Sequence, residues 1–183
     1  MTKKIGSLIG FIALVALFTS CLTIEKKVYT FEMKDNNSGT LTIKYVNIMS
    51  IKDDNTDVSE ADFEELISEY IDGNKLESDY PGAVVKSKRL FEENGELCGE
   101  VIIEFTELAS VGLYQYDSKS PYMFNIGSFF DSESYLSSNG EFGGDVMPVI
   151  FWPRNLKTLT LTTLTTTPDE STVGLVSLFR VKY

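Results

Sequence analysis

Polar and apolar residues alternate in two runs of this chain, at residues 28–33 and 40–48. Alternation with a period of two is typical of a strand with one buried face. The second run would present an apolar face of Leu41, Ile43 and Tyr45 and a polar face of Thr40, Thr42 and Lys44. The turn-forming residues at 35–39 separate the runs. We therefore expect an antiparallel hairpin with one side against a core and the other in water.

A second hairpin is predicted around Asn94-Gly95, a dipeptide favoured in tight two-residue turns. Its strands would cover residues 84–93 and 96–108, and pairing Glu93 with Glu96 fixes their register. This register sets three pairs opposite one another: Arg89 with Glu100, Phe91 with Cys98, and Val84 with Phe105. The buried face of the second strand would then consist of Leu97, Val101, Ile103 and Phe105.

Residues 59–72 show the helical pattern. Ser59 is a suitable N-cap, Asp62 would complete a capping box, and Val58 and Phe63 hold the positions of a hydrophobic staple. The apolar stripe comprises Phe63, Leu66, Ile67, Tyr70 and Ile71. Gly73 would end the helix. We expect the stripe to cover one face of the sheet that contains the 84–108 hairpin.

The remaining pattern is less regular. Residues 109–147 mix aromatic residues with Ser, Asp and Gly, and predict one strand near 122–126 and loops elsewhere. Further strands are expected at 146–152, 157–166 and 173–182. About eight or nine strands and one helix predict the α+β class: a single antiparallel, β-rich domain over residues 28–183 with one helix packed on a sheet.

The N-terminus reads as a secretory signal: Lys3 and Lys4 precede an apolar run at 5–18, which is too short to span a bilayer as a helix. The sequence Leu-Phe-Thr-Ser-Cys at 17–21 resembles the lipobox of bacterial lipoproteins. This resemblance implies removal of residues 1–20, acylation of Cys21 with diacylglycerol and a fatty acid such as palmitate, and a tether at 21–27. An uncleaved signal anchor is the alternative. Leu22, where an Asp could stand, implies the outer membrane if the source has two membranes.

Charge narrows the class of partner. Acidic residues outnumber basic ones 27 to 16, no histidine is present, and the formal net charge is −11. Loss of Lys3 and Lys4 would leave 14 of the 16 basic residues against the same 27 acidic ones, so the mature chain would carry −13. Nucleic acid would repel such a polyanion, so we expect no nucleic-acid partner. An anionic membrane surface would repel it too, so the lipid itself must hold the protein there.

An acidic segment follows the second strand. Asp53, Asn55, Asp57 and Glu64 match four oxygen-ligand positions of a calcium loop. Val58 stands where that loop needs a glycine, and its side chain already has a use as the staple to Phe63. We therefore expect a solvated linker rather than a metal site.

Catalytic groups are not evident. Cys98 has no histidine to activate it and is expected to be a packed strand residue. Glu100 and Glu104 share a strand face, as acid and base residues of a glycosidase could, but such pairs arise by chance among 27 acidic residues. No nucleophile elbow or phosphate loop is present. We therefore expect no enzyme and no cofactor.

Aromatic residues are the best candidates for binding. The possible ligand or partner surface comprises Tyr114, Tyr116, Phe129, Phe130 and Trp152, with core packing as the alternative use. The whole pattern resembles uncharacterised bacterial lipoproteins with a small β-rich domain, which implies no particular activity. We expect a lipid-anchored cell-envelope protein that binds another protein or an envelope component without catalysis. The alternative is a carrier that holds a hydrophobic ligand between helix 59–72 and the sheet.

Overall fold

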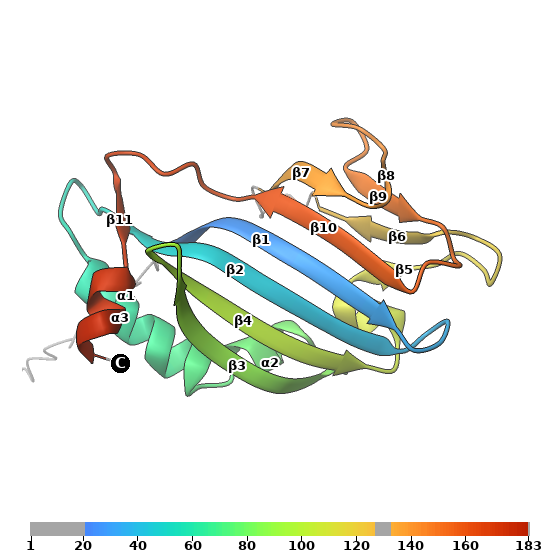
Figure 1. Cartoon of the computed structure of the whole chain (residues 1–183), viewed down its shortest axis with the longest axis horizontal. Helices are drawn as coiled ribbons and strands as arrows, with labels where there is room; N and C mark the ends of the chain where they lie inside the picture. The colour runs from blue at the N-terminus through green and yellow to red at the C-terminus, as the bar shows by residue number, and fades with distance from the viewer. Residues whose placement is uncertain (1–20, 127–132, 183) are drawn as a thin grey trace, which may run out of the picture.

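The computed structural model describes residues 21–126 and 133–182, which form two antiparallel sheets with short helices beside them (Figure 1). The larger sheet contains β1 (Leu22–Met33), β2 (Gly39–Ile51), β3 (Val84–Glu93), β4 (Glu96–Phe105), β7 (Ser134–Ser138), β10 (Thr158–Leu164) and β11 (Thr172–Gly174). The smaller sheet contains β5 (Leu113–Tyr114), β6 (Tyr122–Asn125), β8 (Glu141–Phe142) and β9 (Val149–Trp152). The helical segments are α1 (Ser59–Glu65), the π-helical η1 (Leu66–Ile71), α2 (Lys75–Asp79), the 3₁₀ turn η2 (Leu108–Val111) and α3 (Val176–Lys182). The domain is therefore β-rich and antiparallel, as the alternating pattern predicts.

Strand order follows from the two hairpins. The larger sheet runs β3-β4-β2-β1-β10-β7. β11 pairs with the last residues of β2, which follow the residues of β2 that pair with β4. The smaller sheet runs β5-β6-β9-β8. Both predicted hairpins are confirmed, and Glu93 pairs with Glu96 as expected. A bulge between Val85 and Ser87 shifts the far end of the second hairpin, so Val84 lies opposite Glu104 rather than Phe105.

One face of the larger sheet is covered by two different elements. Side chains of alternate β4 residues point to the same face, and they enter two cores. Val101, Ile103 and Phe105 pack with residues of the smaller sheet such as Trp152. Leu97, four residues before Val101, packs instead with the helix. Figure 1 shows α1 and α3 at one end of the larger sheet and the smaller sheet towards the other.

Asn47 divides β2 between these two cores. Its φ of 54° lies in the left-handed region, which Asn tolerates better than most residues. Before this position the core-facing residues are Leu41 and Ile43, and after it Ile48 faces the helix. The Asn47 side chain donates a 3.0 Å hydrogen bond to Glu25 of β1. The irregularity at Asn47 therefore turns the following part of β2 towards the helix.

The predicted helix packs on the sheet as expected, but its details differ. Phe63 and Leu66 are buried against Ile48 and Leu97. The helix begins at Ser59 without a side-chain cap, so the predicted capping box is wrong. The Asp57 carboxylate accepts the Ser59 N–H at 2.9 Å instead. The Asp62 carboxylate is turned to the sheet, where it accepts the Ser50 hydroxyl at 2.5 Å, because that buried hydroxyl needs a partner.

The N-terminal segment is a strand and not a tether. β1 begins at Leu22, directly after Cys21, whose carbonyl accepts the Ile51 N–H at 2.8 Å. The expected tether at 21–27 is therefore wrong. Leu22 and Ile24 pack beside the helix core, and this apolar pair is too short to show an alternation by itself.

The C-terminal segment also differs from its prediction. The expected strand at 173–182 divides into β11 and α3. Leu175, Leu178 and Phe179 contact the helix core at helical spacing, and this contact selects the helix. With α2, η2 and α3 present, the prediction of a single helix is wrong. The strand expected at 122–126 is confirmed as β6, whereas β5, β7 and β8 were missed because they contain only two to five residues each.

The described helices are all short. Within residues 21–126 and 133–182, none is long and apolar enough to cross a membrane.

Truncation of Phe63 tests the packing of the helix on the sheet. Phe63→Ala should lower the free energy of unfolding by about 3 to 5 kcal/mol, because a buried ring is lost and a cavity is left. Glu60→Ala, at an exposed position on the same helix, should change it by less than about 0.5 kcal/mol. Urea denaturation measures both values. Equal effects of the two substitutions would show that the helix does not contribute to the core.

Candidate ligand-binding cleft

Two adjoining clefts lie on the covered face of the larger sheet. The first, of about 410 Å³, lies between the sheet and the helical segment η1–α2. The second, of about 640 Å³, lies between the sheet, the chain around α2 and η2, and β6. Lys27, Tyr45 and Asp79 line both. They are therefore two parts of one hollow, which we call the binding cleft.

The first part of the binding cleft is mainly apolar. Leu22, Ile24 and Ile48 contribute from the sheet, and Leu66, Ile71 and Leu76 from the helical segment. Gly99 of β4 also lines it, and a Cβ there would lie 3.3 Å from the Ile48 side chain and 3.5 Å from that of Leu90. A larger side chain at this position would occupy the hollow. The absence of one keeps the space beneath the helix open.

The helical wall is locally π-helical. η1 runs from Leu66 to Ile71, and Leu66, Tyr70 and Ile71 all line the first part of the cleft. A π-helical turn adds one residue per hydrogen-bonded ring and so changes the direction of the side chains that follow. Segments of this kind are frequent at functional sites, because the wider turn costs stability.

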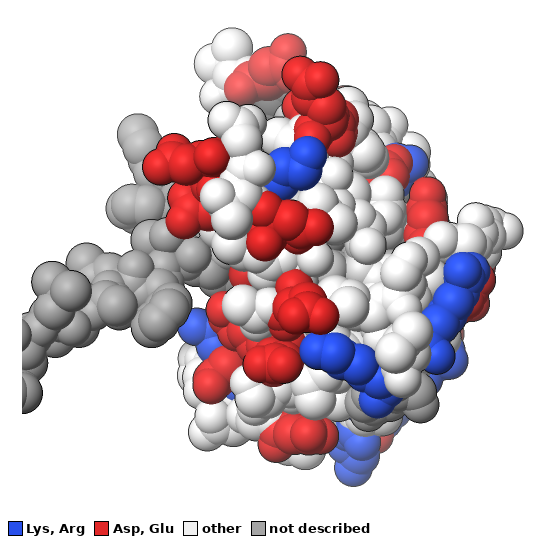
Figure 2. Space-filling model, turned by 90° about the vertical axis from the view of Figure 1, so that its left-hand side faces the viewer, with Lys and Arg blue, Asp and Glu red and all other residues white. Residues whose placement is uncertain are grey.

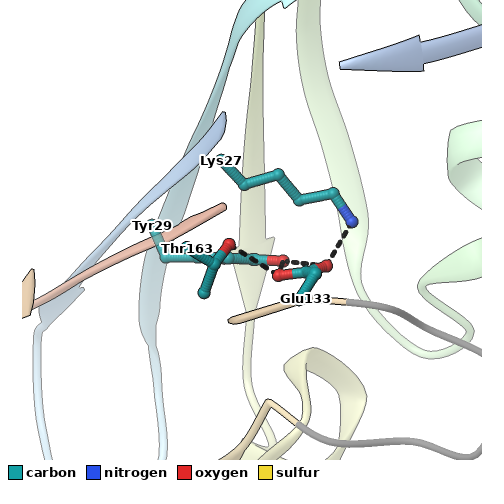
Figure 3. Close-up of polar contacts among 4 residues, drawn as sticks. All are labelled: Lys27, Tyr29, Glu133 and Thr163. Carbon is teal, nitrogen blue, oxygen red and sulfur yellow. Dashed lines mark hydrogen bonds and ion pairs between the residues drawn. The ribbon is translucent and has the colours of Figure 1, made fainter. Parts of the chain in front are cut away.

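A buried charge cluster borders the second part of the cleft (Figure 3). The Glu133 side chain is 8% exposed and receives the Lys27 ammonium at 2.5 Å. The Tyr29 hydroxyl lies 3.1 Å from each of its carboxylate oxygens, and the Thr163 hydroxyl donates at 2.7 Å. Figure 3 shows the three partners converging on one carboxylate from β1 and β10. Burial of a charge is tolerated only with such compensation.

Two tyrosines of the binding cleft have strongly perturbed hydroxyls. Burial, and then the negative charge of Glu133, raise the pKa of Tyr29 far above its usual range. Burial also raises the pKa of Tyr45, with smaller effects from Tyr80 and from Asp79. Strongly shifted groups beside a cleft mark a candidate functional site.

The predicted aromatic surface is not one cluster. Tyr114 and Tyr116 are 56% and 77% exposed and line neither part of the cleft. Trp152 is fully buried, and its indole donates a 2.8 Å hydrogen bond to Asn139, so its prediction as a surface residue is wrong. Its ring is packed between the two sheets, where burial of so large an apolar group is most favourable. Phe129 and Phe130 lie outside the described residues.

The acidic segment at 53–57 is a turn. Asp53 and Thr56 exchange backbone hydrogen bonds, and Asp54 and Asn55 between them have positive φ. The Glu64 carboxylate points towards Lys182 of α3, 3.4 Å away. Among the residues that the structure describes, no group of three or more Asp, Glu or Cys side chains is arranged to hold a metal ion.

The other candidate residues are engaged in packing or ion pairs. Cys98 is buried, and burial raises the pKa of its thiol. Glu100 receives the Arg89 guanidinium at 2.8 Å. Glu104 lies 3.4 Å from Lys86 and 3.8 Å from Lys34. Cations thus partner both carboxylates.

Sequence reasoning missed Lys27, Asp79 and Glu133. One signal was available: Lys27 lies two residues before Tyr29 and four before Phe31, so it belongs to the core-facing row of β1. A lysine in such a row calls for an acidic partner. The identity of that partner could not be inferred, because Glu133 is 106 residues away.

Substitution of Tyr29 tests the charge cluster. Tyr29→Phe should lower the free energy of unfolding by about 1 to 3 kcal/mol at pH 7, since it removes a hydroxyl bonded to a buried carboxylate. The folded-state pKa of Tyr29 is raised, so above about pH 10 only the unfolded chain ionises there, and the wild type loses about 1.4 kcal/mol per pH unit from this group. The difference in the free energy of unfolding between wild type and Tyr29→Phe should therefore become smaller from pH 10 to 11. Denaturation curves across this range check it, and a constant difference would contradict it.

Comparison with known proteins gives no relative from which a role could be transferred. The chain matches no protein-family model, no curated protein and no solved structure. The geometry of the binding cleft is therefore the basis on which a function can be argued.

Proposed function

We propose that this chain is a lipid-anchored protein of the cell envelope that binds an amphipathic ligand without catalysis. The observation that carries the proposal is the binding cleft, whose first part has a mainly apolar lining and whose junction with the second part is bordered by Lys27, Tyr45 and Asp79. This is the carrier alternative of the sequence analysis. That alternative places a hydrophobic ligand between helix 59–72 and the sheet, and the first part of the cleft lies between the sheet and the segment η1–α2.

The dimensions and lining of the cleft support this role. Its first part, of about 410 Å³, falls within the range of small-molecule sites. Such sites are mostly apolar and have a few polar groups that orient the ligand. Leu66 and Ile48 would contact an apolar chain, while Lys27 and Asp79 lie where the two parts meet. The division suits a molecule with one apolar and one polar end.

The position of Cys21 supports a link between the cleft and a membrane. Leu22, the next residue, lines the first part of the cleft. An acyl group on Cys21 would therefore hold the cleft close to the lipid surface without an intervening tether. Figure 2 shows that acidic side chains prevail over basic ones on the left-hand face of Figure 1, where α1 and α3 lie. Anionic headgroups would repel this face, so the lipid would provide the attachment.

A partner-binding module is the second candidate. Tyr114 and Tyr116 are exposed on and just after β5, at the edge of the smaller sheet. Exposed tyrosines are enriched at protein interfaces, where the ring is buried and the hydroxyl remains hydrogen-bonded. This surface would serve an interaction role if the binding cleft takes no ligand.

Binding of a neutral amphiphile tests the cleft. Octyl glucoside should bind the full chain with a one-to-one saturable isotherm, because its alkyl chain fits the apolar part. Leu90→Trp should abolish this binding, since Leu90 lines the cleft beside Gly99 and the larger side chain would fill it. Ser87→Trp, at an exposed position of the same strand, is the matched control and should bind normally. Isothermal titration calorimetry in lipid nanodiscs, with empty nanodiscs as the blank, measures this. Equal binding by the two variants would reject the cleft as the site.

Substitution of Cys21 tests the anchor. Cys21→Ser should move the protein from the membrane fraction to the soluble fraction or leave it unprocessed, because the acyl chains have no sulfur to attach to. Mass spectrometry of the native membrane-bound protein should find an acylated Cys21 as its first residue. A membrane-bound form with residues 1–20 intact would contradict the proposed anchor.

A further inference from the structure

Basic and acidic side chains of the binding cleft differ in whether they have a partner. Three of the described residues that line it are basic, and each of them is paired with a carboxylate. Lys27 is paired with Glu133, Lys88 with Glu77 and Arg89 with Glu100. The Asp79 carboxylate, at the junction of the two parts, has no ion pair or side-chain hydrogen bond with another described residue. The charge offered to a ligand at the junction is therefore negative.

Three tyrosines line the cleft at the junction or on one side of it. Tyr45 lines both parts of the cleft with Asp79, Tyr70 lines the first part, and Tyr80 lines the second. These three rings come from β2, η1 and the residue after α2. Burial is the main cause of the raised pKa values of Tyr45 and Tyr70, and the charge of Asp79 contributes to both. Tyr45 is thus the tyrosine that shares both parts of the cleft with Asp79.

A carboxylate beside several tyrosine faces is the chemistry that recognises a cation. The face of an aromatic ring carries negative potential, so it attracts an ammonium group within about 6 Å of its centre. Such groups bind well at sites where aromatic rings exclude water and a carboxylate balances the charge. The apolar first part of the cleft continues from this point beneath the helix.

We propose that the ligand of the binding cleft is an amphiphile with a cationic ammonium head, bound at Asp79 among Tyr45, Tyr70 and Tyr80, and an apolar chain that enters the space lined by Ile48 and Leu66. This inference rests on the proposed function and names the chemical class of its ligand. An anionic head is disfavoured because Lys27 is already held by Glu133. The net charge of −11 also repels anions from the whole chain.

Three amphiphiles with the same alkyl chain test the proposal. Octyltrimethylammonium, octyl glucoside and octanoate are titrated into the full chain in nanodiscs, with empty nanodiscs as the blank. The cation should bind about tenfold more tightly than the neutral compound, and octanoate should bind more weakly than either. Asp79→Asn should remove the preference for the cation, so that octyltrimethylammonium and octyl glucoside bind this variant with similar affinities.

Asp72→Asn is the matched control. Asp72 is exposed in the same helical region and lines neither part of the cleft, so its substitution makes the same change in net charge without altering the junction. It should keep the preference for the cation. Thermal unfolding of both variants should match that of the wild type, which shows that each is folded.

Any other result of these titrations would contradict a specific part of the proposal. Equal affinities for the three compounds would reject the cationic head while the proposed binding function stands. A preference that survives Asp79→Asn, or that falls equally in Asp72→Asn, would reject Asp79 as its source. Binding of none of the three compounds would reject the proposed function together with this inference.

Discussion

The apolar row on one face of the larger sheet is the constraint on which the rest of the structure depends. On β4 this row extends from Leu97 to Phe105, and neither the helix nor the smaller sheet covers all of it. The helix buries one end of the row and the smaller sheet buries the other, because a continuous exposed apolar row is unfavourable in water. The binding cleft lies where the two covers meet. The hollow is therefore a direct consequence of how this face is buried.

The positive φ of Asn47 and the bulge at Val85–Ser87 are local adjustments to the same constraint. A regular strand presents alternate residues to one face throughout its length. The larger sheet needs to follow two covers that differ in shape, so its strands change direction between them. The π-helical turn of η1 is a comparable irregularity on the helical side. Asn47 lies between Tyr45 and Ile48, which line the cleft, and the bulge directly precedes Lys88, which also lines it.

The ion pair of Lys27 and Glu133 has a different energetic character from the apolar packing. The Glu133 carboxylate is buried and Lys27 is partly buried, and such a pair gains little net stability because both charges lose hydration. Removal of one partner is far more damaging, since it leaves the other charge uncompensated. The hydroxyls of Tyr29 and Thr163 complete the hydrogen bonding of the carboxylate and fix its direction. We interpret the cluster as a specific connection between β1, β10 and the chain before β7.

The sequence by itself determined the elements whose signals are local. Asn94-Gly95 fixes a hairpin register, and the stripe containing Phe63 and Leu66 predicts a helix against the sheet, because turn geometry and side-chain periodicity act over a few residues. Only the tertiary structure decided that Leu22 belongs to a strand, that residues 176–182 form a helix and that Trp152 is buried. In these short segments packing outweighs intrinsic preference. The binding cleft was equally beyond the sequence, since Lys27, Asp79 and Glu133 meet only when segments up to 106 residues apart are folded together.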